Sequence, residues 1–316
     1  MKIVAANDSA SSRETSILQK LESAGVKHIV KLLDSFVHQG PNGNHRCFVF
    51  ELLGPTIDFV MSDYRDNDQA LEPETILRIT SHLLQSLAAM HGAGYAHGGV
   101  CFFLPGCPRV MLKVVFADIS GGNVAFTTRA LDGLSLEDMF KVIGAPKTEK
   151  LARLDGKALA PSMPSQLVEK VRWAHWIDED DEDIRVIDFG ETFARGAEPD
   201  QLAEPAGLQV PEKIFTGKFD YRVDLWRAGC MVRHPDSYPS MRYKKKMSDA
   251  AGQIYTLLFC SRPFQTVGGD MDVLVAQMIL FVEDLPAERQ PRWKQMRASA
   301  GRKLPSMINP PCPCSP

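Results

Sequence analysis

The residues best suited to chemistry in this sequence are acidic and amide side chains beside glycines and short apolar runs. Asp188, Phe189 and Gly190 follow the strand-like run 184–187. An aspartate at a strand end can hold magnesium against the phosphates of ATP, and the glycine lets the backbone turn sharply. Alone this tripeptide is a weak signal, because Asp-Phe-Gly also arises as an ordinary turn.

A second polar pair lies upstream, where Asp118 and Asn123 bracket a glycine-rich stretch just before the apolar run 124–126. An aspartate here can accept the proton of a substrate hydroxyl, and an asparagine can hold a second metal ion. The same residues also fit a glycine-rich turn with two Asx side chains, so the pair by itself leaves both interpretations open.

Two further motifs follow in order, at 210–212 and 224–229. With four motifs in this order, the sequence resembles a eukaryotic protein kinase, and most closely the fungal relatives of the SR-protein kinases. The same resemblance extends to a hinge strand at 48–55, the start of a catalytic loop at 95–98 and the approach to a metal-binding loop at 176–190.

The resemblance implies an α+β, bilobal protein-kinase-like fold, with a small β-rich N-terminal lobe and a larger, mainly helical C-terminal lobe. Residues 1–53 are expected to form a partial N-terminal lobe, 54–303 the C-terminal lobe, and 304–316 a disordered tail. Apolar periodicity independently predicts strands at 30–36 and 47–53, a turn at 40–44, and helices at 11–21 and 73–90.

The resemblance also implies roles in the smaller lobe. Lys2 matches the strand lysine that binds the α- and β-phosphates of ATP, and Glu14 matches the helix glutamate that pairs with it. Phe50 would lie at the back of the nucleotide pocket, and the backbones of Glu51 and Leu53 would bind adenine. Without the resemblance, these residues fit a solvated lysine, a helix-surface carboxylate and a buried strand.

In the larger lobe, Asp118 matches the catalytic base, while Asn123 and Asp188 match magnesium-binding residues. Glu212 and Asp224 match structural braces. The implied function is ATP-dependent serine/threonine protein kinase activity, with ATP and Mg²⁺ as cofactors and Arg/Ser-rich proteins among the substrates.

The acidic run 178–183 bears on the substrate. It would attract Arg-rich proteins electrostatically, or it would form a solvated charged loop.

The sequence departs from the family pattern at its start and in two foreign stretches. The matching lysine is residue 2, with no Gly-rich loop ahead of it, so the expected N-terminal lobe is truncated. Residues 99–117 separate His97 from Asp118, and residues 232–253 interrupt an apolar helical run. Removing both stretches restores the family motifs, and their ends fit translated introns.

Two substitutions within the motifs bear on activity. Ser120 stands where such kinases usually have a lysine that neutralises the γ-phosphate, and Gly98 stands where they have an arginine. A catalytically impaired pseudokinase that acts as a binding module therefore stays open. A small-molecule kinase of the aminoglycoside or choline type also stays open, although the motifs at 210–212 and 224–229 favour a protein substrate.

Composition limits the remaining classes. The net charge of −3 gives no basic field for direct nucleic-acid binding. No apolar run approaches the roughly 18–20 residues of a membrane-spanning helix, and the N-terminus does not resemble a signal peptide. The 7 scattered cysteines fit reduced thiols, which predicts an intracellular protein of the cytoplasm or nucleus. A monomer is expected.

Overall fold

The computed structural model describes residues 1–5, 11–67, 71–99, 121–169, 177–202, 209–231, 270–281 and 285–300. The chain divides into a larger compact unit of residues 1–205 and 219–262, and a smaller one of residues 206–218 and 263–316. Within the described ranges, no helix has both the length and the apolar character needed to cross a membrane. The two foreign stretches, apart from Gly99, and the tail lie outside these ranges.

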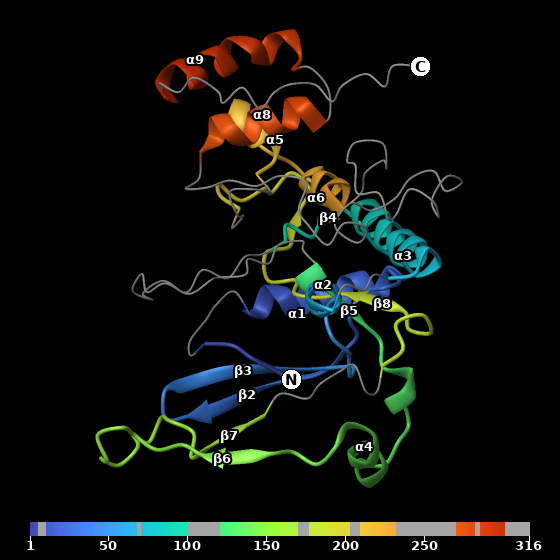
Figure 1. Cartoon of the computed structure of the whole chain (residues 1–316), viewed down its shortest axis with the longest axis vertical. Coiled ribbons are helices and arrows are strands. Elements are labelled where there is room, and N and C mark those ends of the chain that lie inside the picture. The colour runs from blue at the N-terminus through green and yellow to red at the C-terminus, as the bar shows by residue number, and fades with distance from the viewer. Residues whose placement is uncertain are drawn as a thin grey trace. The chain divides into compact units, whose positions relative to one another are not determined.

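A three-stranded antiparallel sheet, in the order β1, β3, β2, belongs to the larger unit (Figure 1). Its strands are β1 (Lys2–Ile3), β2 (Leu32–Gly40) and β3 (Gly43–Phe50). Gly40 pairs with Gly43, which confirms the turn predicted at 40–44. The strands reach closer to that turn than the predicted 30–36 and 47–53, because a tight connection keeps its polar neighbours in the hydrogen-bonded ladder.

The two helices predicted from apolar spacing are α1 (Ser11–Ser23) and α3 (Pro73–Gly92). A proline suits the start of α3 because the first helical N–H has no partner within the helix. The buried apolar face of α3 consists of Ile76, Ile79, Leu83, Leu87 and Met90. Leu84 is 44% exposed, because the residue after Leu83 is rotated by about 100° around the helix and so lies off the buried face.

The remaining elements of the larger unit are short. Three pairs of strands are antiparallel: β4 (Tyr95–Ala96) with β9 (Phe193–Ala194), β5 (Val124–Phe126) with β8 (Ile184–Val186), and β6 (Thr148–Lys150) with β7 (Gln166–Val168). The helical elements are α2 (Ile57–Asp66), η1 (Gly121–Asn123), η2 (Arg129–Leu131), α4 (Leu136–Ile143) and α6 (Val223–Met231).

The described part of the smaller unit is helical. Its elements are α5 (Pro211–Thr216), α8 (Met271–Phe281), η6 (Ala287–Arg289) and α9 (Gln290–Ala300). The guanidinium of Arg289 lies 5.6 Å from the ring centroid of Phe215, within cation–π range, and so links η6 to α5.

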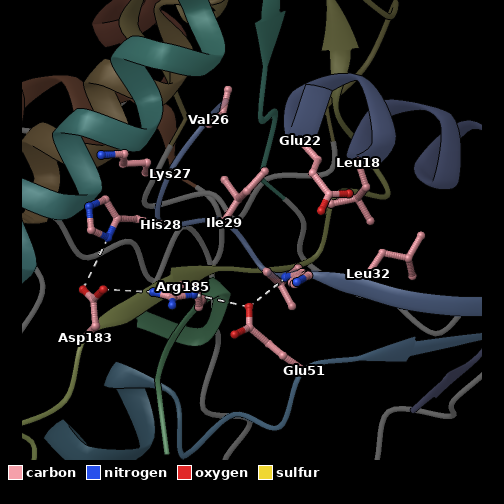
Figure 2. A pocket seen from close by; sticks show the side chains of 12 residues that line it. Leu18, Glu22, Val26, Lys27, His28, Ile29, Leu32, Glu51, Asp183 and Arg185 are labelled. Atoms are coloured by element: carbon pink, nitrogen blue, oxygen red, sulfur yellow. Dashed lines mark hydrogen bonds and ion pairs between the residues drawn. The ribbon is translucent and has the colours of Figure 1, made fainter. Parts of the chain in front are cut away.

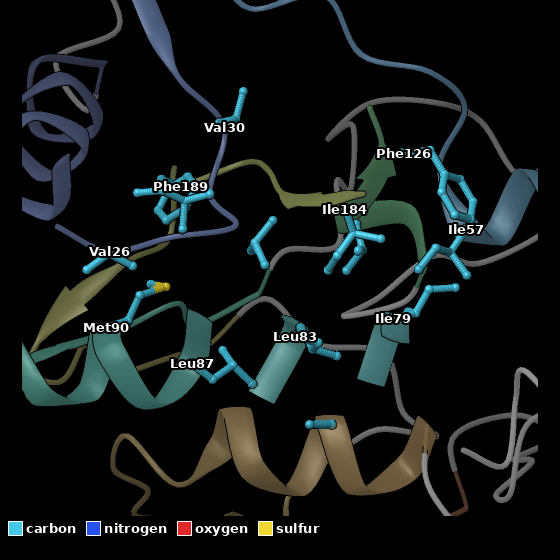
Figure 3. Close-up of a cluster of buried hydrophobic side chains, with 14 of the residues drawn as sticks. Val26, Val30, Ile57, Ile79, Leu83, Leu87, Met90, Phe126, Ile184 and Phe189 are labelled. Carbon is cyan, nitrogen blue, oxygen red and sulfur yellow. The ribbon is translucent and has the colours of Figure 1, made fainter. Parts of the chain in front are cut away.

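One hydrophobic cluster joins α1, α3, β5 and β8. In Figure 3, Leu83, Leu87 and Met90 of α3 line the side of this cluster opposite Ile184 and Phe189. Burial of these side chains is the main force that holds the short strands on α3. The polar residues that flank β5 and β8 are therefore held on a packed base.

Candidate nucleotide and metal site

The turn after β8 presents a carboxylate at the end of a buried strand. Asp188 has φ 64°, a left-handed conformation that aspartate adopts more readily than most residues. The next side chain, Phe189, is 0% exposed and packs edge-on against His97, with ring centroids 5.1 Å apart. Burial of this phenyl ring fixes the turn and leaves the Asp188 carboxylate half-buried at the surface of the core.

The Asp188 carboxylate meets two charged residues from the N-terminal segment. The Nζ of Lys2 lies 2.8 Å from Asp188 Oδ1 and 3.0 Å from both carboxylate oxygens of Glu14. Burial alone would lower the pKa of Lys2, but the two carboxylates outweigh it and raise that pKa above its usual value. The ammonium is therefore charged and held between the sheet, α1 and the turn after β8.

Asn123 lies beside this turn because β5 pairs with β8. Its backbone oxygen accepts a 2.9 Å hydrogen bond from the N–H of Ile187, the residue before Asp188. Its side-chain nitrogen is buried and has no hydrogen-bond partner among the described residues. That nitrogen is a hydrogen-bond donor and cannot ligate a cation, so a divalent ion at this site would take the amide oxygen of Asn123 and the carboxylate of Asp188 as ligands. Asn123 and Asp188 could thus hold magnesium.

The predicted adenine-binding strand is shorter than expected: β3 ends at Phe50, so Glu51 and Leu53 follow it, and their side chains do not all face one way. Phe50 and Leu53 pack against the hydrophobic cluster. Glu51 instead uses its carboxylate to accept bonds from the N–H of Lys31, at 2.8 Å, and from Arg185 Nε, at 3.3 Å. A role of Glu51 at adenine would therefore be limited to its backbone.

A cavity of about 400 Å³ is lined in part by Glu51 (Figure 2). Leu18, Val26, Ile29 and Leu32 supply apolar lining, while Asp183, Arg185 and Glu51 form a row of ion pairs along it. Lys2, Asn123 and Asp188 do not line this cavity, so it differs from the nucleotide hollow expected beside them.

The start of the expected catalytic loop, at His97 and Gly98, is held by hydrogen bonds to side chains of α6. The buried carboxylate of Asp224 accepts bonds from the N–H of His97, at 2.7 Å, and of Gly98, at 3.1 Å, and lies 3.0 Å from His91 Nε2. Arg227, 1% exposed, donates to the carbonyl oxygens of Gly98 and Gly99.

The structure does not describe every residue that the sequence analysis singled out in the larger lobe. Asp118 and Ser120 lie outside the described residues, so the geometry of the expected base is not defined. Glu212 is half-buried in the first turn of α5, within the smaller unit. Arg227 was missed from the sequence, although a charged residue within an apolar helix motif was the available signal.

The acidic run 178–183 contains both buried and solvent-exposed side chains. Glu182 is 3% exposed and accepts bonds from the hydroxyl of Thr127, at 2.5 Å, and the N–H of Arg129, at 2.8 Å. Asp178 and Asp181 are exposed. The run is therefore not a uniformly solvated loop, because its C-terminal part supports η2 and β5.

Comparisons with known proteins bear on this arrangement, although no family model matches the chain. Protein kinase dsk1 of Schizosaccharomyces pombe is 39% identical over 89 residues, which cover 25% of this chain and 16% of that protein. Serine/threonine-protein kinase SKY1 of Saccharomyces cerevisiae is 40% identical over 72 residues, 23% of this chain and 9% of that protein. Serine/threonine-protein kinase SRPK of Physarum polycephalum is 24% identical over 214 residues, 65% of this chain and 44% of that protein.

Each of these matches spans less than half of the relative's own length. A crystal structure of a kinase domain aligns over 95% of this chain and 67% of its own, with a TM-score of 0.50 and 17% identity. The fold class predicted from the sequence is confirmed, as is the resemblance to SR-protein-kinase-like serine/threonine kinases.

Proposed function

We propose that this chain, which has the fold of a protein kinase domain and SR-protein-kinase-like relatives, transfers the γ-phosphoryl group of ATP to serine or threonine hydroxyls of proteins. The observation that carries the proposal is the convergence of Lys2, Glu14 and Asp188. Lys2 is separated from the two acids by 12 and 186 positions, yet one ammonium contacts both carboxylates. A lysine paired with a helix glutamate, and an aspartate placed to bind magnesium, are the parts that protein kinases use to hold ATP.

The chain's residues would divide the work as follows. Lys2, oriented by Glu14, would bind the α- and β-phosphates, and Asp188 with Asn123 would hold magnesium. When bound, magnesium neutralises charge on the phosphates. Asp118 would accept the proton of the substrate hydroxyl as its oxygen bonds to the γ-phosphorus. The bond from that phosphorus to the ADP oxygen breaks in the same displacement, so positioning supplies most of the catalysis.

Arg/Ser-rich proteins are the substrate class we propose, and the exposed acids Asp178 and Asp181 support it. Surface carboxylates contribute mainly to association, which salt weakens. Asp181→Asn should therefore raise KM for an Arg/Ser-repeat peptide about twofold at low salt. Asp155→Asn, an exposed acid paired with Arg153, is the matched control and should leave KM unchanged.

A catalytically impaired kinase fold that serves as a binding module is the second candidate. The observation in its favour is the cavity beside Glu51, which Lys2, Asn123 and Asp188 do not line. The absent γ-phosphate lysine at Ser120 is consistent with it.

Two measurements separate the candidates. Thermal unfolding of the full chain with and without Mg-ATP reports nucleotide binding. Transfer of labelled phosphate to an Arg/Ser-repeat peptide, by the full chain and by a chain lacking 99–117 and 232–253, reports catalysis. Asp188→Asn should abolish both signals, whereas Asp220→Asn, a surface change, should preserve them. Nucleotide binding without transfer in either chain would favour the binding module, and absence of both signals would refute the kinase proposal.

A further inference from the structure

Three metal-ligating side chains converge beside the cavity, away from the expected magnesium residues. They are His28 in the segment before β2, His82 on α3, and Asp183 just before β8. The Nδ1 atom of His82 lies 2.5 Å from Asp183 Oδ1, and the Nδ1 atom of His28 lies 3.3 Å from the same oxygen. All three ligand atoms lie within 4.8 Å of one another. Figure 2 shows His28 directed toward Asp183.

Both histidine nitrogens lie within ion-pair distance of the same Asp183 oxygen, but the geometry of these contacts is poor for hydrogen bonds. Both Nδ1 atoms are buried, and within the described parts of the chain neither has a hydrogen bond of acceptable geometry. The imidazole rings instead stack, with centroids 4.0 Å apart and planes 9° from parallel. Buried polar atoms are nearly always satisfied in native proteins, so two such nitrogens aimed at one oxygen need a further partner.

The surrounding contacts hold each ligand in place. His28 has φ 57°, and its carbonyl oxygen accepts a 2.8 Å bond from the N–H of Val186, which ties it to β8. The second oxygen of Asp183 lies 3.0 Å from Arg185 Nη1, which keeps Oδ1 toward the histidines. The residue after His82 on α3, Leu83, is buried in the core, which holds this part of the helix in place. Support of this kind around the ligands is what a metal site requires.

We propose that His28, His82 and Asp183 bind a divalent transition-metal ion of the zinc class through two imidazole nitrogens and one carboxylate oxygen. Nitrogen ligands select zinc and its neighbours over magnesium and calcium, and water would complete a tetrahedral shell. The ion would join the segment before the sheet, the long helix and β8. Because none of these ligands belongs to the expected nucleotide site, the proposal is independent of phosphoryl transfer.

Metal–ligand bonds of 2.0–2.1 Å in a tetrahedron place neighbouring ligand atoms about 3.3 Å apart. The separation of His28 Nδ1 and Asp183 Oδ1 already has this value. His82 would move away from Asp183 by less than about 1 Å, and the two rings would tilt out of their stack, because imidazole binds a metal within its ring plane.

The test uses the full chain after treatment with a chelator. Titration with Zn²⁺, followed by calorimetry, should show one ion bound, and Zn²⁺ should raise the Tm by a few degrees. His28→Asn, which tolerates the left-handed backbone, and His82→Asn should each weaken binding at least tenfold. His38→Asn changes an exposed histidine of β2 and should not. Equal affinity in all four proteins would overturn the proposal.

A second measurement needs no variant. X-ray absorption at the zinc edge of the loaded wild-type chain should show nitrogen and oxygen ligands, including two imidazoles. A sulfur shell would place the ion on cysteines and refute the assignment. Circular dichroism of the two histidine variants without metal should match the wild type. If a variant misfolds, the absorption spectrum decides the question.

Discussion

Lys2 and Glu14 form a bidentate ion pair, with Nζ 3.0 Å from each carboxylate oxygen, between a two-residue strand and helix α1. Glu14 is 4% exposed and Lys2 is 31% exposed, so water screens this pair only partly. The same ammonium contacts Asp188, so it separates two carboxylates that would otherwise repel each other. The stability of this arrangement therefore depends on Lys2 in a way that the stability of a surface pair would not.

Replacing Lys2 tests that dependence. Lys2→Met should lower the free energy of unfolding by about 2 kcal/mol, since it leaves a buried carboxylate without its cation. It should also abolish the stabilisation by Mg-ATP. Chemical denaturation monitored by circular dichroism measures the first effect. Lys20→Met changes an exposed lysine in the last turn of α1 and should cost under about 0.5 kcal/mol. Equal losses would contradict the role given to the ion pair.

Asp224 should matter far more than its neighbour Asp220. Asp224→Asn should destabilise the chain by about 3 kcal/mol, because an amide cannot accept all the bonds that the buried carboxylate accepts from His97, Gly98 and His91. Asp220 pairs with Arg222, two residues along the chain, and Asp220→Asn should cost under about 1 kcal/mol. Urea denaturation of both variants makes the comparison, and the same midpoint in both would count against an anchoring role.

Gly94 and Gly98 both have a left-handed backbone, but only Gly98 is crowded, so their substitution distinguishes backbone strain from steric contact. Gly98 has φ 76°, and a Cβ there would lie 2.5 Å from the carbonyl oxygen of Glu191. Gly94 has φ 85° and no atom within 4 Å of its Cβ position. Gly94→Ala should therefore cost about 1 kcal/mol from backbone strain alone, and Gly98→Ala clearly more.

The contact at Gly98 also bears on the arginine that the family has at this position. An arginine there would meet the same carbonyl, so Gly98→Arg should not restore activity. Thermal unfolding of the two alanine variants provides the measurement. Identical melting temperatures would show that the chain near Glu191 yields easily.

Local patterns predicted the elements, and the family resemblance predicted which residues come together. The spacing of apolar residues indicated α1 and α3, and the glycines of 40–44 indicated the hairpin, since these signals are local. The meeting of Lys2 with Asp188 came only from the resemblance, because no local rule relates residues at opposite ends of a domain. The role of Asp118 as catalytic base stays a prediction.

The features that were missed are set by tertiary contacts. Glu182 belongs to a charge run that composition alone assigns to the surface, yet Thr127 and Arg129 make its burial favourable. The convergence of His28 with His82 depends on how the segment before β2 packs against α3. Sequence spacing carries no record of that packing.

The pH dependence of stability should report on His97. This side chain is fully buried, and burial lowers its pKa despite the opposing charge of Asp224. Its Nε2 lies 3.0 Å from the carbonyl oxygen of Ile187, and its Nδ1 accepts from the N–H of Gly99 at 3.2 Å, which suits the neutral imidazole. The folded chain thus binds fewer protons at His97 than the unfolded chain does. The contribution of His97 to the free energy of unfolding should be fully present above about pH 6.5, the pKa of histidine in the unfolded chain. It should be lost as the pH falls below that value.

The decline due to His97 can reach about 1.4 kcal/mol per pH unit, the value for one proton. Urea denaturation between about pH 5.5 and 7.5 measures the slope. His97→Phe keeps a ring against Phe189 and removes the titrating group, so it should flatten the slope while lowering stability at pH 7.5 through the lost bonds. His38→Phe, at an exposed position of β2, should keep the wild-type slope. The variant removes only the proton that His97 binds in the unfolded chain. If the free energy of unfolding of His97→Phe keeps the wild-type slope against pH, the acid sensitivity originates at another group.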